Sequence, residues 1–130
     1  MEYKTVDHSL KLAGSPHQVY ELLMDSEKHS AFTGGKAEIS REVGGDFTIM
    51  GGGLGGKNLE LVEDKKIVQS WRAGDWPEGH YSTVTFLLEE EEGETRLSFV
   101  QAGVPASAYE SINDGWRTYY WGPMSKALDD

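Results

Sequence analysis

Apolar and polar residues alternate near the start of the chain. Val6, His8, Leu10 and Leu12 occupy one phase of this alternation, and polar residues stand between them. Successive side chains of a strand point to opposite faces, so the pattern predicts a first strand with one apolar face. His8 shares that face and is expected to point inward.

Two short helices are predicted after this strand. Ser15 suits the N-cap, Pro16 suits the first helical turn, and Gln18 completes a capping box. The apolar side of this first helix consists of Val19, Tyr20, Leu22 and Leu23. Asp25-Ser26 then caps a second short helix, which is expected to end near Phe32–Gly34.

The chain from Lys36 to Gln101 has a strand pattern throughout. The expected strands are Ala37–Val43, Asp46–Met50, Lys57–Val62, Lys66–Ala73, Tyr81–Leu88 and Glu94–Gln101. Short strands that are separated by glycine-containing turns favour an antiparallel sheet built from successive hairpins.

The last part of the chain has helical periodicity. The residues that recur at this spacing are Tyr109, Ile112, Trp116, Tyr119, Tyr120, Met124 and Ala127. Ser107 and Glu110 match a second capping box. Pro123 removes one backbone donor and is expected to kink the helix near Tyr119. Gly115 leaves room for a close neighbour.

These elements predict a single α+β domain over residues 1–130. A curved antiparallel sheet of about seven strands needs a cover for its apolar face, and the long C-terminal helix supplies that cover. Trp116 is expected to be buried between helix and sheet. The two short helices follow the first strand.

Charge narrows the range of partners. The formal net charge is −10, and such an acidic surface repels phosphate backbones, so nucleic acid is not expected as a partner. The sequence contains no cysteine, no signal-peptide pattern and no apolar run of membrane-spanning length. These features predict a cytoplasmic protein without a membrane partner.

The glycine run at Gly51–Asn58, GGGLGGKN, partly matches two phosphate-binding patterns. Both patterns bind phosphate at the start of a helix, whereas the residues from Leu59 to Leu61 continue a strand pattern. The run is therefore interpreted as a hairpin turn, and no nucleotide cofactor is expected.

The positions of the histidines in the sequence indicate neither a metal site nor a catalytic site. The four are His8, His17, His29 and His80, and no two share a helix face at metal-ligand spacing. His8 is interpreted as a core histidine and His80 as part of an exposed loop. No cofactor and no enzyme activity is expected, with a cavity enzyme of the cyclase or hydrolase type as an alternative.

Large aromatic residues converge between the predicted sheet and the last helix. They either form an ordinary core or line a cavity for a small hydrophobic ligand. The candidates for lining such a cavity are His8, Trp71, Phe86, Phe99, Trp116 and Tyr120.

Four motifs resemble those of a known family. They are GGDF at Gly44–Phe47, WRAGDWPEGHY at Trp71–Tyr81, GVP at Gly103–Pro105 and GWRTYYW at Gly115–Trp121. In this order and spacing the chain resembles the activator-of-heat-shock-ATPase homologue family, within the START-like superfamily. The resemblance is to the C-terminal domain of the eukaryotic two-domain activator. It implies a helix-grip fold and a non-enzymatic co-chaperone.

The resemblance also implies a partner, a heat-shock ATPase of the ninety-kilodalton class. The N-terminal activator domain is not represented in this sequence, so stimulation of the ATPase is expected to be weak or absent. The expected contact is the loop that carries Asp75, Trp76, Glu78 and His80. Trp76 either projects as a rigid aromatic anchor beside Pro77 or folds back onto the sheet edge.

Overall fold

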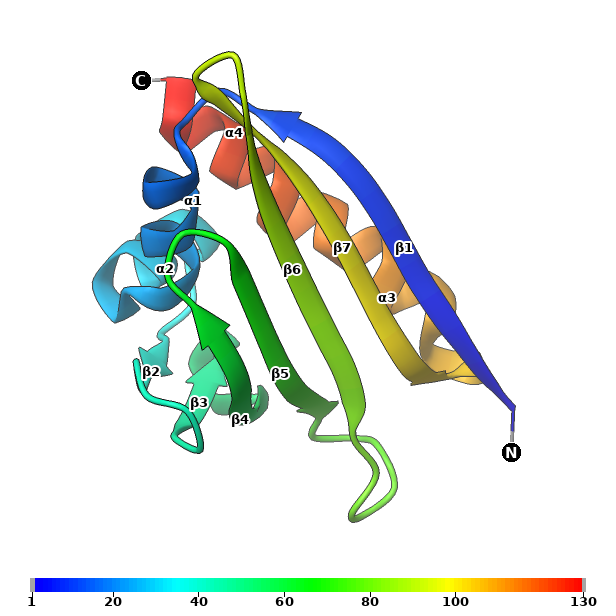
Figure 1. The fold of residues 1–130 in the computed structure, drawn as a ribbon. Helices are drawn as coiled ribbons and strands as arrows, with labels where there is room; N and C mark the ends of the chain where they lie inside the picture. Colours follow the sequence, from blue (N-terminus) through cyan, green and yellow to red (C-terminus); the bar gives the residue numbers. More distant parts are fainter. Residues whose placement is uncertain (1, 130) are drawn as a thin grey trace.

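The computed structural model describes residues 2–129 and contains a seven-stranded antiparallel sheet (Figure 1). The strands are β1 (Tyr3–Leu12), β2 (Glu38–Ile39), β3 (Asp46–Ile49), β4 (Leu54–Val62), β5 (Lys66–Ala73), β6 (Ser82–Glu91) and β7 (Glu94–Pro105). Their order in the sheet is β1-β7-β6-β5-β4-β3-β2. Successive hairpins build the sheet from β2 to β7, and β1 pairs with β7.

Helices cover one face of this sheet. They are α1 (Pro16–Met24), α2 (Ser26–Thr33), α3 (Tyr109–Gly115), the π-helical η3 (Trp116–Trp121) and α4 (Gly122–Asp129), with the 3-10 turns η1 (Met50–Gly52) and η2 (Ala106–Ala108). Figure 1 shows the C-terminal helical segments running along the sheet behind β7 and β1. The predicted α+β helix-grip architecture is confirmed.

The predicted caps of the first two helices are present. The Ser15 hydroxyl accepts a hydrogen bond from the Gln18 backbone N–H, and the Gln18 side chain accepts one from the Ser15 N–H at 2.8 Å. Asp25 caps α2 by accepting from the Lys28 N–H at 3.0 Å, and Gly34 ends α2 in the left-handed conformation. These bonds satisfy backbone groups that a helix end leaves without partners.

The second strand is shorter than predicted. Only Glu38–Ile39 pair as a strand, whereas a strand over Ala37–Val43 was expected. The side chain of Asn58, which is fully buried, donates to the carbonyl oxygens of Ser40 and Glu42 at 2.7 and 3.0 Å. A buried side chain therefore satisfies backbone groups that a longer strand would have paired in a ladder.

The glycine run forms a tight turn and the beginning of β4, as its interpretation as a hairpin turn predicts. The turn at Met50–Gly52 has positive φ angles at all three residues. Gly56 lies inside β4 opposite Trp71, where a Cβ atom would overlap the carbonyl oxygen of Ser70. β4 thus begins at Leu54, earlier than the predicted Lys57, because glycine lets two backbones approach closely.

Replacing Gly56 with alanine is expected to lower the free energy of unfolding by about 1–3 kcal/mol, because the new methyl group displaces the neighbouring strand. Gly53→Ala is the matched control. Gly53 has φ −75°, and its nearest atom to a new Cβ is 3.8 Å away. Urea denaturation of both variants measures the difference, and equal stabilities would contradict the close approach.

The last helix is interrupted as predicted, although the form of the interruption is new. The segment Trp116–Trp121 is π-helical, and the Gly122 N–H donates to the Arg117 carbonyl. Pro123 follows directly and has no N–H for the α-helical bond to Tyr119. The predicted capping box at Ser107 and Glu110 is wrong, because residues 106–108 form a 3-10 turn and α3 begins without a side-chain cap.

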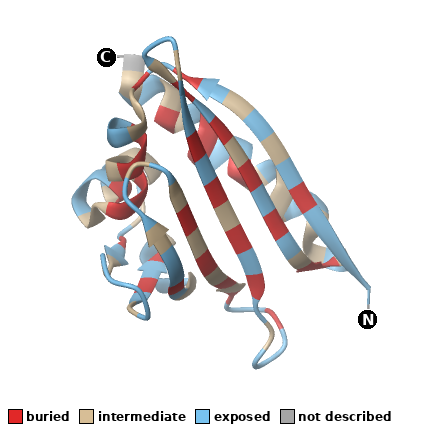
Figure 2. Cartoon of the chain, in the orientation of Figure 1, coloured by how far each residue is buried: buried red, intermediate tan, exposed pale blue. Residues whose placement is uncertain are grey.

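The core lies between the sheet and the C-terminal helical segments. Buried and exposed residues alternate along β6 and β7 in Figure 2, as the sequence pattern predicts. Trp116 is 4% exposed and its ring centroid lies 4.4 Å from that of Phe99 and 4.5 Å from that of Tyr120. The predicted burial of Trp116 is confirmed.

Candidate functional site

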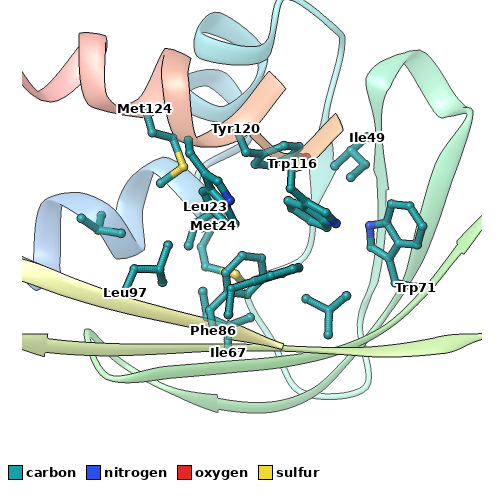
Figure 3. Close-up of a cluster of buried hydrophobic side chains, with 14 of the residues drawn as sticks. Leu23, Met24, Ile49, Ile67, Trp71, Phe86, Leu97, Trp116, Tyr120 and Met124 are labelled. Carbon is teal, nitrogen blue, oxygen red and sulfur yellow. The ribbon is translucent and has the colours of Figure 1, made fainter. Parts of the chain in front are cut away.

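Four of the residues proposed as a cavity lining converge between sheet and helix in Figure 3, namely Trp71, Phe86, Trp116 and Tyr120. Trp71, Phe86, Phe99, Trp116 and Tyr120 are all buried. The cavity that remains beside Trp71, Phe86, Trp116 and Tyr120 is about 10 Å³, which is space for roughly one water molecule, and Phe99 does not line it. In this conformation the interior therefore holds a packed core without room for a drug-sized ligand.

A chain of buried polar groups fixes the position of Trp116. Its indole N–H donates to Gln101 Oε1 at 2.7 Å, and Gln101 Nε2 donates to the Ser82 hydroxyl at 2.9 Å. Ser82 donates in turn to the Trp71 carbonyl oxygen. This chain links the C-terminal helical segments to three adjacent strands, and each buried polar group in it has a partner.

The sequence analysis missed the role of His29, which is 4% exposed. Its Nδ1 donates to the Leu23 carbonyl oxygen at 3.1 Å, and its Nε2 accepts from the Tyr120 hydroxyl at 2.7 Å. Burial lowers the pKa of His29 to about 4, because desolvation disfavours the charged imidazole. Burial also raises the pKa of Tyr120. The pair is neutral at pH 7 and joins α2 to the C-terminal helical segments.

His8 faces inward from β1, as predicted, but it does not line the interior cavity. It is half-buried, and its Nδ1 accepts from the Trp121 indole N–H at 2.8 Å. Its Nε2 then carries the proton and donates to Asn113 Oδ1 at 2.8 Å. His8 therefore ties β1 to the C-terminal helical segments.

The loop between β5 and β6 is tied down rather than projecting. Trp76 is only 7% exposed and packs against Trp71, with ring centroids 5.4 Å apart, so it adopts the folded-back alternative. Arg72 donates to the Trp76 carbonyl oxygen at 2.7 Å. His80 is half-buried, contacts the Gly103 carbonyl oxygen through Nε2 and stacks on Tyr3. Asp75 and Glu78 are exposed on this rigid loop.

Two surface grooves flank α3, and each contains some of the residues that the sequence analysis singled out. The first, the loop groove, has a volume of about 650 Å³. It is lined by Glu2, Ala73, Asp75, Trp76, Pro77, Pro105, Ala106, Ser107, Ala108, Ser111 and Ile112. The second, the apolar groove, has a volume of about 200 Å³. It is lined by Met50, Leu54, Trp71, Ser111, Ile112, Gly115, Trp116, Tyr119 and Tyr120.

Within residues 2–129, no three histidine, cysteine, aspartate or glutamate side chains gather in a way that could hold a metal ion. None of the helices in this part of the chain is long and apolar enough to cross a membrane.

The seven-stranded antiparallel sheet, the two short helices after β1 and the C-terminal helical segments define a START-like helix-grip protein. The chain belongs to the family described as "Activator of Hsp90 ATPase homolog 1-like protein", whose sequence profile matches residues 13–129. The family to which the four motifs point is thereby confirmed.

Individual relatives agree with this assignment. The human "Activator of 90 kDa heat shock protein ATPase homolog 1" is 36% identical over 107 residues, which cover 82% of this chain and 32% of the human protein. The chain thus spans about a third of that relative's length. An Hsp90 activator from Plasmodium falciparum superposes with a TM-score of 0.91 at 25% identity, with 96% of each chain covered. The Aha1 dimer from Colwellia psychrerythraea superposes with a TM-score of 0.79 at 20% identity, with 93% of each covered, and shares the fold.

Proposed function

We propose that this chain is a non-enzymatic co-chaperone domain that binds an Hsp90-class ATPase in the cytoplasm. The observation that carries the proposal is membership of the activator family over residues 13–129, with relatives that are named as activators of that ATPase. The packed interior also supports it, because a cavity of about 10 Å³ leaves little space for a carried ligand or an enclosed substrate.

The loop groove is the proposed contact surface. The packing of Trp76 on Trp71 and the hydrogen bond from Arg72 to the Trp76 carbonyl oxygen fix the backbone of the loop. The exposed side chains of Asp75 and Glu78 therefore stand on an ordered backbone, which lowers the entropy cost of binding. Trp76 acts as a support under the groove and contributes one edge of it. A rigid groove with an acidic rim suits a basic segment of the chaperone.

Stimulation of the chaperone's ATPase by this chain alone is proposed to be weak. The chain corresponds to 32% of the human activator's length, so most of that protein's surface has no counterpart in the aligned region. Binding and stimulation are therefore separate measurements, and binding is the primary one.

The charge reversal Asp75→Lys is expected to weaken binding to the Hsp90-class chaperone of the same organism by at least about tenfold, or roughly 1.4 kcal/mol. Isothermal titration calorimetry measures the affinity, with an ATPase assay alongside. Glu89→Lys is the matched control, because it makes the same charge change at an exposed site on β6, outside the loop groove.

One outcome would contradict the co-chaperone function, and another would contradict only the proposed contact surface. If the unmodified chain does not bind the chaperone, the co-chaperone function is wrong. If Asp75→Lys and Glu89→Lys weaken binding equally, only long-range charge matters and the loop groove is not the contact. Trp76→Ala is unsuitable as the first variant because Trp76 is buried and its loss disturbs the loop itself.

A further inference from the structure

The apolar groove has the walls of a small binding site, and it lies outside the packed interior. It opens between η1 with the start of β4 on one side and α3 with the π-helical η3 on the other. Trp71, Trp116 and Tyr120 line both this groove and the interior cavity, so they separate the two. A volume of about 200 Å³ is sufficient for a substituted benzene ring, since a buried apolar cavity of about 150 Å³ accommodates benzene.

One residue that lines this groove carries a hydrogen-bond donor without a partner. Trp71 is 3% exposed, and its indole Nε1 is buried without a hydrogen-bond partner. The indoles of Trp116 and Trp121 differ, because each donates to an acceptor at 2.7 or 2.8 Å. Buried polar groups are nearly always paired in native proteins, so an orphaned indole N–H calls for a specific explanation.

The geometry around Trp71 indicates how an acceptor could reach this N–H. Figure 3 shows the Trp71 nitrogen on the side of the ring that faces Trp116. The two rings are tilted by 42° with centroids 5.9 Å apart, so they form a wedge and do not stack. Nε1 itself has almost no exposed surface, so a ligand in the groove reaches it only when the Trp71 or Trp116 side chain moves.

The chemistry of the lining selects the ligand class. The nine residues that line the groove carry no charge. Burying an unpaired charge there would be costly, so the ligand is uncharged. The large aromatic walls favour a planar aromatic body, and the single orphaned donor favours one carbonyl or ether oxygen.

We infer that the apolar groove binds a small, uncharged aromatic molecule whose one hydrogen-bond acceptor takes the Trp71 indole N–H. Its lining shares only Ser111 and Ile112 with the loop groove, which is the proposed chaperone contact. It also differs from the cavity that the sequence suggested, because Phe86 and Phe99 do not line it.

The test uses two probes of nearly equal shape, acetophenone and α-methylstyrene, which differ in having a C=O or a C=CH₂ group. Each is titrated into ¹⁵N-labelled protein, and the tryptophan indole N–H resonances are followed by NMR. The Trp71 resonance is identified from its absence in Trp71→Phe. Acetophenone is expected to bind at least about fivefold more tightly and to move the Trp71 indole proton downfield.

Two variants locate the binding. Trp71→Phe retains an aromatic ring and is expected to abolish the preference for the ketone. Gly115→Leu is expected to block both probes, since a Cβ at Gly115 meets only Tyr119 at 3.9 Å and the longer side chain enters the groove. Glu110→Leu is the control on the same helix, because Glu110 is exposed and outside the groove.

The inference is overturned if neither probe shifts a resonance up to its solubility limit. The role assigned to the Trp71 indole N–H is refuted if the two probes bind with equal affinity. It is also refuted if Trp71→Phe still prefers the ketone. Binding that persists unchanged in Gly115→Leu would place the probe elsewhere and refute the site.

Discussion

Replacing Trp116 with alanine is expected to lower the free energy of unfolding by about 3–5 kcal/mol, the range for deleting a fully buried large aromatic side chain. Trp116 is 4% exposed and touches aromatic rings from the sheet and from its own helix. Its removal also leaves the buried Gln101 Oε1 without the indole donor. Both effects act in the same direction.

Guanidinium or urea denaturation measures this loss. Tyr119→Ala is the matched control, because Tyr119 lies in the same π-helical segment but is 50% exposed, and it is expected to cost less than about 1 kcal/mol. Trp116→Phe separates the hydrogen bond from most of the packing. A loss below about 1 kcal/mol for Trp116→Ala would mean that the helix does not pack on the sheet through this residue.

Lowering the pH from about 6.5 to 4 is expected to remove about 3 kcal/mol of stability through His29 alone. The pKa of His29 is about 4 in the folded protein and 6.5 in the unfolded chain, so the unfolded chain binds the proton more readily in this window. The contribution is complete above pH 6.5 and is lost as the pH falls towards 4. Each tenfold change in proton affinity corresponds to about 1.4 kcal/mol.

Carboxylates also titrate at low pH, so the measurement must be differential. His29→Gln cannot titrate, yet its amide can still hydrogen-bond to the Tyr120 hydroxyl, which His29 contacts at 2.7 Å. Stabilities of wild type and His29→Gln are compared at several pH values from 7 to 4. The wild type is expected to lose more stability than the variant over this range. Parallel curves would show that His29 is accessible to protons in the folded state.

The sequence alone determined the elements whose signals are local. Strands β5 and β7 begin where the alternation predicts, and the Ser15 capping box forms because its partners are three residues apart. The sequence predicts one long helix after the six successive strands, and packing this helix on the apolar face of the sheet covers that face. The family motifs identified the same fold, and the family assignment is confirmed.

Features that depend on contacts between residues far apart in the sequence could not be predicted from local patterns. The length of β2 is set by Asn58, 16 and 18 residues away from the carbonyl groups that it satisfies. The alternation over Ala37–Val43 could not reveal that competition. Ser107 and Glu110 have the spacing of a capping box, but the chain leaves β7 through a 3-10 turn that prevents it.

The candidate sites show the same division most clearly. Sequence order established that large aromatics meet between sheet and helix, because parity and helical spacing fix which side each one faces. Only the tertiary structure decided that they fill the interior, that Trp76 folds onto Trp71, and that His29 is buried against Tyr120, 91 residues away. Periodicity fixes the direction of a side chain, whereas the volume between packed surfaces and the pairing of buried polar groups depend on all the side chains that meet there.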